Sequence, residues 1–452
     1  MNRPALRMQT SSAAALQTRP PAVQSKFPFY LVLFSLLLEF GRPQDMLGVR
    51  GIPLPSIIDT LIAVIVLVFS GKLNFSNLQT RLWIPLLALM TLHAPLATNN
   101  FYAAMTLKDM FLLFCVYLGI ITYIDSFDRL RTLLKVWLAV HIVLAVLGII
   151  ARGKGIGGWL GDENDFCMEL NVVIPFVFFA LTSNHEKQSR IIYASILCLF
   201  VLAAMTTLSR GGFIGLATVG TYCWMRSSKK FGAILVMGLL IIFMIAFAPA
   251  EYWQEVQSIT DEETMTVGTG GDRMYIWGIG WEMFLANPII GVGQGNLPWD
   301  FEEYEAGRTF MTRSRAGRQA HSAYFTLFPE LGLAGIGIFG AMIYRNFKDT
   351  RQVEQLYNVS KRKNVSDKNV ANLGFAVTFA HSLEGSMVGY LVSSVFISTL
   401  YYPSFWIIMA FVVALKNAAV REYKVGGDVK ESSLPVSPRP VARVWRPRPY
   451  TS

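Results

Sequence analysis

The stretch Ile234–Phe247 reads Ile-Leu-Val-Met-Gly-Leu-Leu-Ile-Ile-Phe-Met-Ile-Ala-Phe and contains no charged side chain. Similar apolar blocks recur along the chain, and about 20 apolar residues are needed to cross ~30 Å of hydrocarbon as a helix. A helix satisfies its own backbone hydrogen bonds in lipid. A transmembrane β-barrel would instead need short strands of alternating polarity, and this block does not alternate. We therefore predict an all-α polytopic membrane protein.

The composition supports this fold class. Of 452 residues, 53% are hydrophobic and 15% are charged, whereas about a quarter of the residues in soluble domains are charged. The formal net charge is +10, but basic loops beside membrane spans are the normal result of membrane insertion, so we expect no nucleic-acid partner. The four cysteines lie in apolar blocks without CxxC spacing, and we interpret them as small buried hydrophobic residues.

We predict about twelve transmembrane helices, near residues 27–41, 56–71, 82–98, 107–124, 131–151, 166–183, 190–208, 211–226, 231–249, 322–344, 372–392 and 400–417. The predicted organisation is a disordered cytoplasmic tail (1–26), helices one to nine (27–250), a large extracytoplasmic loop (251–321), helices ten to twelve (322–417) and a second disordered cytoplasmic tail (418–452).

The orientation follows from the basic residues, which gather in alternate loops and in both tails. The positive-inside rule places these loops and both termini in the cytoplasm. The long segment 251–321 then lies on the opposite face, between helices nine and ten. It begins with acidic residues, ends with arginines and is rich in tryptophan. We expect it to fold as a cap on the membrane.

Arginines on the outer face run against the insertion rule and need another explanation. Arg210 lies in Leu208-Ser209-Arg210-Gly211-Gly212, where paired glycines allow a sharp turn or a close approach to a ligand, and Arg273 follows Gly270-Gly271-Asp272. Arg313, Arg315 and Arg318 end the loop. Each arginine could reach lipid headgroups or pair with the acids of the loop. As a set, they predict a converging anion site, since guanidinium groups bind phosphate oxygens bidentately.

His321 follows these arginines and precedes an apolar helix. Arginines and a helix N-terminus both favour the neutral imidazole, which suits a general base. We interpret His93, His141 and His381 as structural. The acidic turn Gly161-Asp162-Glu163-Asn164-Asp165 leaves three alternatives open: its carboxylates could bind a divalent cation, form a solvated turn or orient a sugar hydroxyl.

Five motifs occur in order: Leu208–Gly212, Gly271–Trp277, Asn287–Gly293, Ala320–Tyr324 and Pro329–Gly335. In this order, and with the long loop between them, they resemble the O-antigen ligase and polymerase family of bacterial envelope enzymes. The acidic turn and Gly389-Tyr390-Leu391-Val392 are more similar to an O-glycosylation-ligase-like branch found near exopolysaccharide and exosortase systems.

The resemblance implies a metal-independent, cofactor-free glycosyltransferase in the bacterial cytoplasmic membrane, with its active site facing the periplasm. Its donor would be a glycan on a polyprenyl diphosphate, and its acceptor a lipid, saccharide or protein hydroxyl. The family's diphosphate-binding arginines match Arg210 and Arg273, and its essential histidine matches His321. Arg313, Arg315, Arg318, Asp162 and Asp165 are further candidates for substrate binding. A polytopic transporter or flippase for a lipid-linked glycan is the alternative function.

Overall fold

The computed structural model describes residues 26–49, 51–70, 75–183, 186–247, 253, 269–311, 313–362 and 366–426. This described part is built from helices, and its only β pairing is an isolated bridge between Phe310 and Arg313. It confirms the prediction of a helical membrane protein. The predicted N-terminal tail, apart from Lys26, and residues 251–252, 254–268 and 312 of the predicted cap lie outside the described residues.

The N-terminal half contains α1 (Lys26–Gly41), α2 (Pro43–Met46), α3 (Leu54–Val64) with η1 (Ile65–Phe69), α4 (Leu78–His93), α5 (Asn100–Tyr123), α6 (Phe127–Ile150), η2 (Gly158–Gly161), α7 (Glu163–Ser183), α8 (Lys187–Thr206), α9 (Arg210–Arg226) and α10 (Lys230–Phe247). The rest contains α13 (Thr269–Ala286), α14 (Leu297–Glu305), α15 (Ala323–Arg362), α16 (Asp367–Ser393), η4 (Ser394–Phe396) and α17 (Pro403–Gly426).

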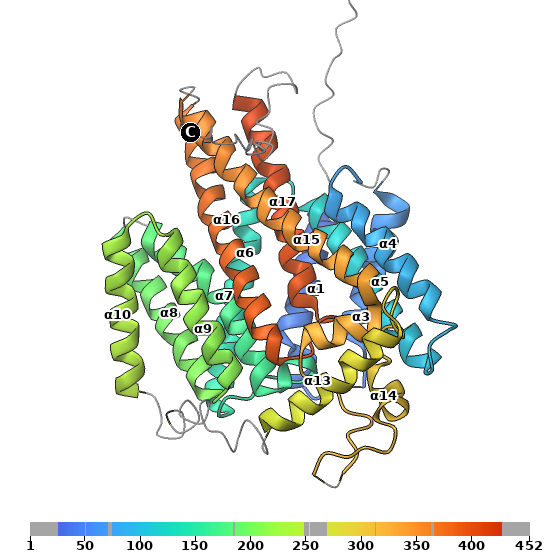
Figure 1. Cartoon of the computed structure of the whole chain (residues 1–452). Coiled ribbons are helices and arrows are strands. Elements are labelled where there is room, and N and C mark those ends of the chain that lie inside the picture. Colours follow the sequence, from blue (N-terminus) through green and yellow to red (C-terminus); the bar gives the residue numbers. More distant parts are fainter. Residues whose placement is uncertain are drawn as a thin grey trace, which may run out of the picture.

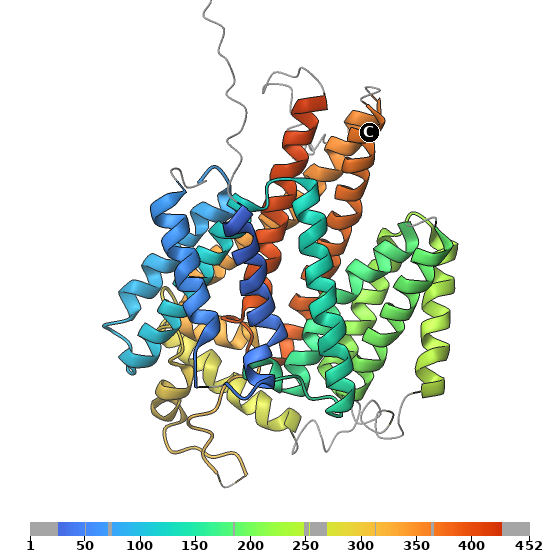
Figure 2. The same cartoon turned by 180° about the vertical axis from the view of Figure 1, so that it is seen from behind.

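The helices form a bundle with two flanks around a central group (Figures 1 and 2). Helices α8, α9 and α10 lie on one flank, and α1, α3, α4 and α5 lie on the other. Between them, α16 packs against α7, α9, α15 and α17. Helices α13 and α14 lie at the end of the bundle opposite the C-terminal end of α17 (Figure 1). They therefore cover one end of the molecule.

The outer surface of the bundle is suited to lipid. In the described part of the chain, six helices are long and apolar enough to cross a membrane: α5, α6, α7, α8, α15 and α17. Helix α10 and the α3–η1 pair are shorter apolar helices. Exposed apolar side chains cover α10, among them Ile234, Leu239, Ile242 and Ile245. Such a patch would be unfavourable in water, and it is accommodated by hydrocarbon.

Two predicted boundaries were wrong. Helix α15 was predicted to end near residue 344, but it continues to Arg362. Its extension buries Asp349, which lies 3.0 Å from the Arg345 Nε atom and 3.1 Å from the Lys416 Nζ atom. Pairing of these charges between α15 and α17 lets a basic segment remain a packed helix. Helix α17 likewise continues to Gly426, into the predicted tail, and residues 427–452 lie outside the described residues.

Helix α15 is broken at Gly332, whose φ of 58° and ψ of −159° are not helical. The freed backbone groups bind the segment 288–293. The Val292 and Gly293 N–H groups donate to the carbonyls of Pro329 and Glu330, at 2.8 and 2.9 Å. Reciprocal hydrogen bonds run from Leu333 N–H to the Pro288 carbonyl and from Ala334 N–H to the Ile289 carbonyl.

The side chain of Glu330 completes this contact. It is 2% exposed and accepts the N–H groups of Gly295 at 2.8 Å and Leu297 at 3.2 Å. The Tyr401 hydroxyl also donates to it, at 2.6 Å. Polar groups in a membrane protein are tolerated when they are paired in this way. The broken helix and the residues that lead into α14 are therefore joined as one unit.

We predict that Gly332→Ala destabilises the protein more than Gly337→Ala does. At position 332 a Cβ atom would lie 2.7 Å from the Ile289 carbonyl, whereas nothing lies within 4 Å of a Cβ at position 337 on the same helix. The backbone conformation at 332 alone costs a non-glycine residue roughly 1–3 kcal/mol. Thermal unfolding in nanodiscs measures the difference, and equal midpoints for both variants would contradict this account of the break.

Candidate functional site

A cavity of about 560 Å³ lies where the ends of four helices meet, and we call it the arginine cavity. Its basic residues are Arg152, Arg210 and Arg273, and Glu163 supplies a negative charge. Asn164, Ser209, Trp277 and Phe396 contribute to the walls. Arg210 is the first residue of α9, and Arg273 is the fifth residue of α13. The N-terminus of a helix attracts anions, so the helix ends and the arginine side chains both favour a negatively charged ligand.

The turn before Arg210 is held by Ser209. Its hydroxyl oxygen accepts the Gly212 N–H at 3.0 Å and so caps α9. The same hydroxyl donates to the Asn164 side-chain oxygen at 2.7 Å. Leu208 turns the chain with a φ of 53°. The beginning of α9 is therefore tied to the beginning of α7, and this fixes the base of Arg210.

The paired glycines do not make the predicted sharp turn, but Gly211 lines the arginine cavity, and a close approach to a ligand stays a prediction. Gly211 and Gly212 are helical, and the left-handed residue of the turn is Leu208. A Cβ atom at Gly212 would lie 2.2 Å from the Cys167 Sγ atom of α7, and one at Gly211 would lie 2.9 Å from the Phe396 ring. The glycines allow α9 to pack closely, while Leu208 makes the turn.

Arg273 is positioned by the packing of α13. The Trp277 ring stacks on Phe325 with a centroid distance of 4.8 Å, and its indole N–H donates to the Ala320 carbonyl at 2.7 Å. Partial burial, assisted by the nearby Arg210 guanidinium, lowers the pKa of Arg273. This repulsion is relieved when an anion binds between the two arginines.

His321 does not line the arginine cavity, but it directly follows Ala320, which is held by Trp277. It is exposed and has a left-handed backbone with a φ of 47°. Helix α15 begins two residues later. Desolvation by the surrounding protein atoms and the Arg273 guanidinium lower the pKa of His321, although part of its side chain reaches solvent. The structure thus brings His321 beside the cavity and favours its neutral form.

The other predicted residues divide into two groups. Arg315 and Arg318 both pair with Asp272, and the Arg318 pair has a distance of 3.3 Å. This agrees with the predicted alternative in which these arginines pair with acidic residues of the loop. Arg313 is exposed and bridges Phe310 through its backbone. These three arginines are not part of the wall of the cavity in the described residues.

The acidic turn lies between two helices. Asp162 accepts the Asn164 backbone N–H at 2.8 Å, which caps α7. Asp165 is buried, and Tyr402 lies near it. In the part of the chain that the structure describes, no three His, Cys, Asp or Glu side chains are grouped as metal ligands. Asp162 thus holds the turn, and Asp165 is buried beside it.

Arg152 was missed by the sequence analysis although it lines the cavity. Its signal was present in Arg152-Gly153-Lys154, a basic stretch on the predicted outer face. We treated positive charge there as unexpected only from residue 210 onward. Asn164 and Trp277 were also missed as wall residues, and their roles depend on contacts between distant segments.

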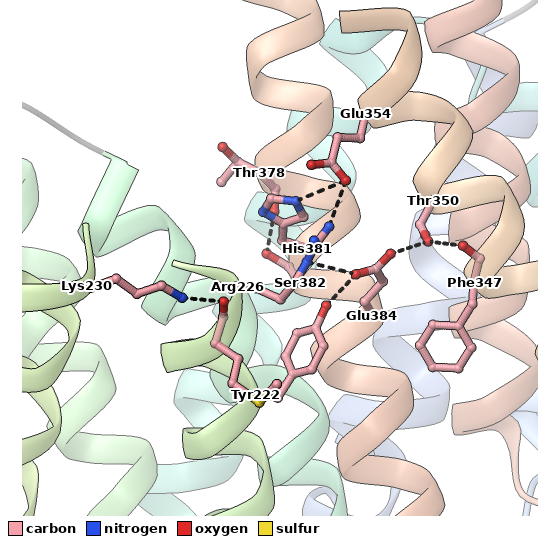
Figure 3. Close-up of polar contacts among 11 residues, drawn as sticks. Tyr222, Arg226, Lys230, Phe347, Thr350, Glu354, Thr378, His381, Ser382 and Glu384 are labelled. Carbon is pink, nitrogen blue, oxygen red and sulfur yellow. Dashed lines mark hydrogen bonds and ion pairs between the residues drawn. The ribbon is translucent and has the colours of Figure 1, made fainter. Parts of the chain in front are cut away.

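A cluster of charged side chains lies at the other end of α9 (Figure 3). Arg226 lies 2.8 Å from Glu354 and 3.3 Å from Glu384, and thus joins α9 to α15 and α16. Glu384 also accepts the Thr350 hydroxyl at 2.7 Å, and His381 lies 4.0 Å from Glu354. Arg226 is 16 residues, or roughly 24 Å, from Arg210 along the helix. The cluster therefore fastens three helices far from the arginine cavity.

Comparison with known families identifies the domain around the arginine cavity. Residues 194–340 match the family model described as O-antigen ligase. This segment contains an O-antigen ligase domain. It begins in α8, includes Arg210, Arg273 and His321, and ends in α15 beyond the break at Gly332. No curated protein matches the chain.

We predict that Arg273→Gln raises the pKa of His321 from below the ordinary value of about 6.5 toward that value. The substitution removes a positive charge that disfavours the imidazolium. Arg308→Gln is the control, because Arg308 pairs with Glu282 instead, at 2.6 Å. The pH dependence of His321 modification by diethylpyrocarbonate, followed by peptide mass spectrometry, measures the shift. If the midpoint of the pH dependence of His321 modification is unchanged in Arg273→Gln, the charge of Arg273 does not influence His321, which contradicts this prediction.

Proposed function

We propose that this protein is a glycosyltransferase that moves a glycan from a polyprenyl diphosphate to an acceptor hydroxyl at the outer face of the bacterial cytoplasmic membrane. One observation carries the proposal: Arg210 and Arg273, both in the segment that matches the O-antigen ligase family model, line one cavity. Their pairing suits a diphosphate, which has oxygens enough to engage both guanidinium groups. The acceptor belongs to a lipid, a saccharide or a protein.

The reaction proposed is a single displacement at the anomeric carbon. His321 accepts the proton of the acceptor hydroxyl, and the oxygen forms a bond to the anomeric carbon. The bond from that carbon to the diphosphate oxygen breaks, and its electron pair leaves with the diphosphate. The new bond forms on the face of the sugar opposite the bond that breaks, so the configuration at the anomeric carbon inverts.

Arg210 and Arg273 stabilise the leaving group in this scheme. Negative charge on the diphosphate grows as the bond to the sugar breaks, so preorganised cations favour the transition state over the ground state. The arginines supply the positive charge, and the proposed reaction uses no metal ion and no cofactor. Arg313, Arg315 and Arg318 remain predicted contacts to the anionic substrate, and Asp162 and Asp165 remain predicted contacts to its sugar.

The proposed topology has about twelve membrane spans. It includes helices α1, α3–η1, α4, α9, α10 and α16 in addition to the six longer apolar helices. Both termini lie in the cytoplasm, and the segment 251–321 faces the periplasm. The arginine cavity then opens where lipid-linked glycans are presented, with the polyprenyl tail lying in the membrane.

We predict that cysteines placed on the two ends of the molecule differ in access from outside the cell. Glu303 on α14 and Lys361 at the end of α15 are both exposed. In intact spheroplasts, an impermeant maleimide should label Glu303→Cys and leave Lys361→Cys unlabelled until the membrane is opened. The reversed pattern would put the arginine cavity in the cytoplasm and contradict the proposed function.

We predict that His321→Ala and Arg210→Lys impair different steps. Loss of the base should cut turnover by about a hundredfold or more and leave donor binding nearly intact. Arg210→Lys keeps the charge but loses the bidentate contact, so both donor binding and turnover should fall. Binding of a short-chain lipid diphosphate and single-turnover transfer distinguish the two.

Arg308→Lys serves as a matched control, because Arg308 is an outer arginine that pairs with Glu282 outside the cavity. It should retain both donor binding and turnover. Normal turnover in His321→Ala would eliminate its role as the base. Weak donor binding in that variant would make His321 another ligand of the diphosphate.

A further inference from the structure

A second cavity, of about 360 Å³, lies between α1, α3, α5 and the N-terminus of α17. We call it the carboxylate cavity, because Glu39, Asp59 and Asp109 all line it. Its other polar or aromatic lining residues include Arg42, Ser35, Trp159 and Tyr402. Glu39 lies near the C-terminal end of α1, and Tyr402 directly precedes α17. These ends lie at the same end of the bundle as α13 (Figure 2).

The two cavities have opposite charge. The arginine cavity has three arginines and one glutamate, whereas the carboxylate cavity has three carboxylates and one arginine. Carboxyl groups outnumber arginines in this lining, so the cavity disfavours phosphates and acidic sugars, and Lys108 pairs with one of these carboxyl groups, that of Asp109, at 3.0 Å. It favours a ligand that donates hydrogen bonds, since carboxyl oxygens accept them.

The carboxylates are held by neighbouring groups. The Ser35 hydroxyl donates to an Asp59 oxygen at 2.6 Å. The Trp159 indole N–H donates to the Glu39 Oε1 atom at 2.8 Å, and Arg42 approaches the same oxygen at 3.4 Å. Asp59 lies in an apolar helix, where a carboxylate is costly and usually marks a functional site.

Aromatic rings complete the lining. Trp159 and Tyr402 pack together with a centroid distance of 5.3 Å. Their faces offer apolar surface, while the carboxylates beside them offer acceptors. A saccharide ring has the matching chemistry, with C–H groups on its faces and hydroxyls around its edge. We propose that the carboxylate cavity binds a hydroxyl-rich saccharide unit that has no acidic group.

The two cavities share the turn that joins α6 to α7. Trp159 faces the carboxylate cavity, and Glu163 and Asn164 line the arginine cavity. Tyr402 lies near Asp165 of this turn, and Asn164 accepts the Ser209 hydroxyl beside Arg210. A sugar in one cavity and a diphosphate in the other are thus separated by one short segment. If the proposed function holds, on which this step rests, the bound saccharide unit belongs to the acceptor or to the donor glycan.

The test is binding of neutral and acidic sugars to the full chain in nanodiscs by saturation-transfer NMR. The probes are methyl glucoside, methyl galactoside, methyl mannoside, methyl N-acetylglucosaminide and methyl glucuronide. At least one neutral glycoside should bind, and the glucuronide should bind more weakly. Because one acceptor oxygen is replaced by an NH2 group that can only donate, Glu39→Gln and Asp59→Asn should each weaken binding of the neutral glycoside by about tenfold.

Glu303→Gln is the matched control, since Glu303 is exposed on α14 outside the cavity, and it should bind as the wild type does. Unchanged binding of a short-chain lipid diphosphate shows that each variant is folded. Absence of binding by every neutral glycoside, or equal binding in Glu39→Gln and wild type, would overturn the inference. Sugar binding needs no transfer, so it can hold even where the proposed reaction fails.

The kinetics of glycan transfer by the Glu39→Gln variant then show whether the bound sugar belongs to the acceptor or to the donor. A raised KM for the acceptor with an unchanged KM for the donor assigns the cavity to the acceptor. The opposite split assigns it to the donor glycan. Unchanged KM values for both, with lost glycoside binding, would overturn a role of the cavity in the reaction.

Discussion

The hydrogen bonds between the broken helix α15 and the segment 288–297 hold the candidate site together. A break in a membrane helix exposes backbone groups that lipid cannot satisfy. Here Val292, Gly293, Leu333 and Ala334 donate across the break, and Glu330 accepts two further N–H groups. The break therefore becomes a junction from which α13 and α14 are held against the bundle.

The two arginines of the site, Arg210 and Arg273, are positioned by separate pairs of helices, and the junction holds the pair that carries Arg273. Arg273 reaches the cavity from α13, which packs on Phe325 at the start of α15 through Trp277. Arg210 reaches it from α9, which the Ser209 cap ties to α7. Neither arginine is held by the other, and their charges repel. The packing of two separate helix pairs holds the two arginines in place before an anion binds, and Asp162 partly offsets the repulsion at Arg273. Cations placed in advance in this way are the preorganisation that departure of a diphosphate needs.

Much of the fold could be predicted from the sequence, because apolar blocks without alternation have few alternatives in lipid. Each predicted span overlaps a helix, and the break between α16 and α17 lies where it was expected. The ends of α15 and α17 could not be predicted. Asp349 is neutralised by Lys416, a partner 67 positions away, and a pattern within one helix does not contain such a partner.

The candidate site was predictable to the extent that its residues were anomalous. Arg210 and Arg273 lie on the predicted outer face, where arginine is disfavoured, and the structure brings them to one cavity. The sharp turn predicted at Gly211 and Gly212 lies at Leu208 instead, and α7 and Phe396 lie too close to these positions for a larger residue. The carboxylate cavity assembles residues between positions 35 and 407. Their separate positions in the sequence give no sign that they meet.

The most direct test of the central claim is to identify the lipid that leaves during transfer. Purified protein in nanodiscs is given a glycan on a radiolabelled polyprenyl diphosphate and a hydroxyl acceptor, and the released lipid is separated by chromatography. If Arg210 and Arg273 bind the leaving group, one intact lipid diphosphate is released for each glycan transferred. Release of the lipid monophosphate would mean that a phosphate is transferred with the sugar, and it would contradict the proposed reaction.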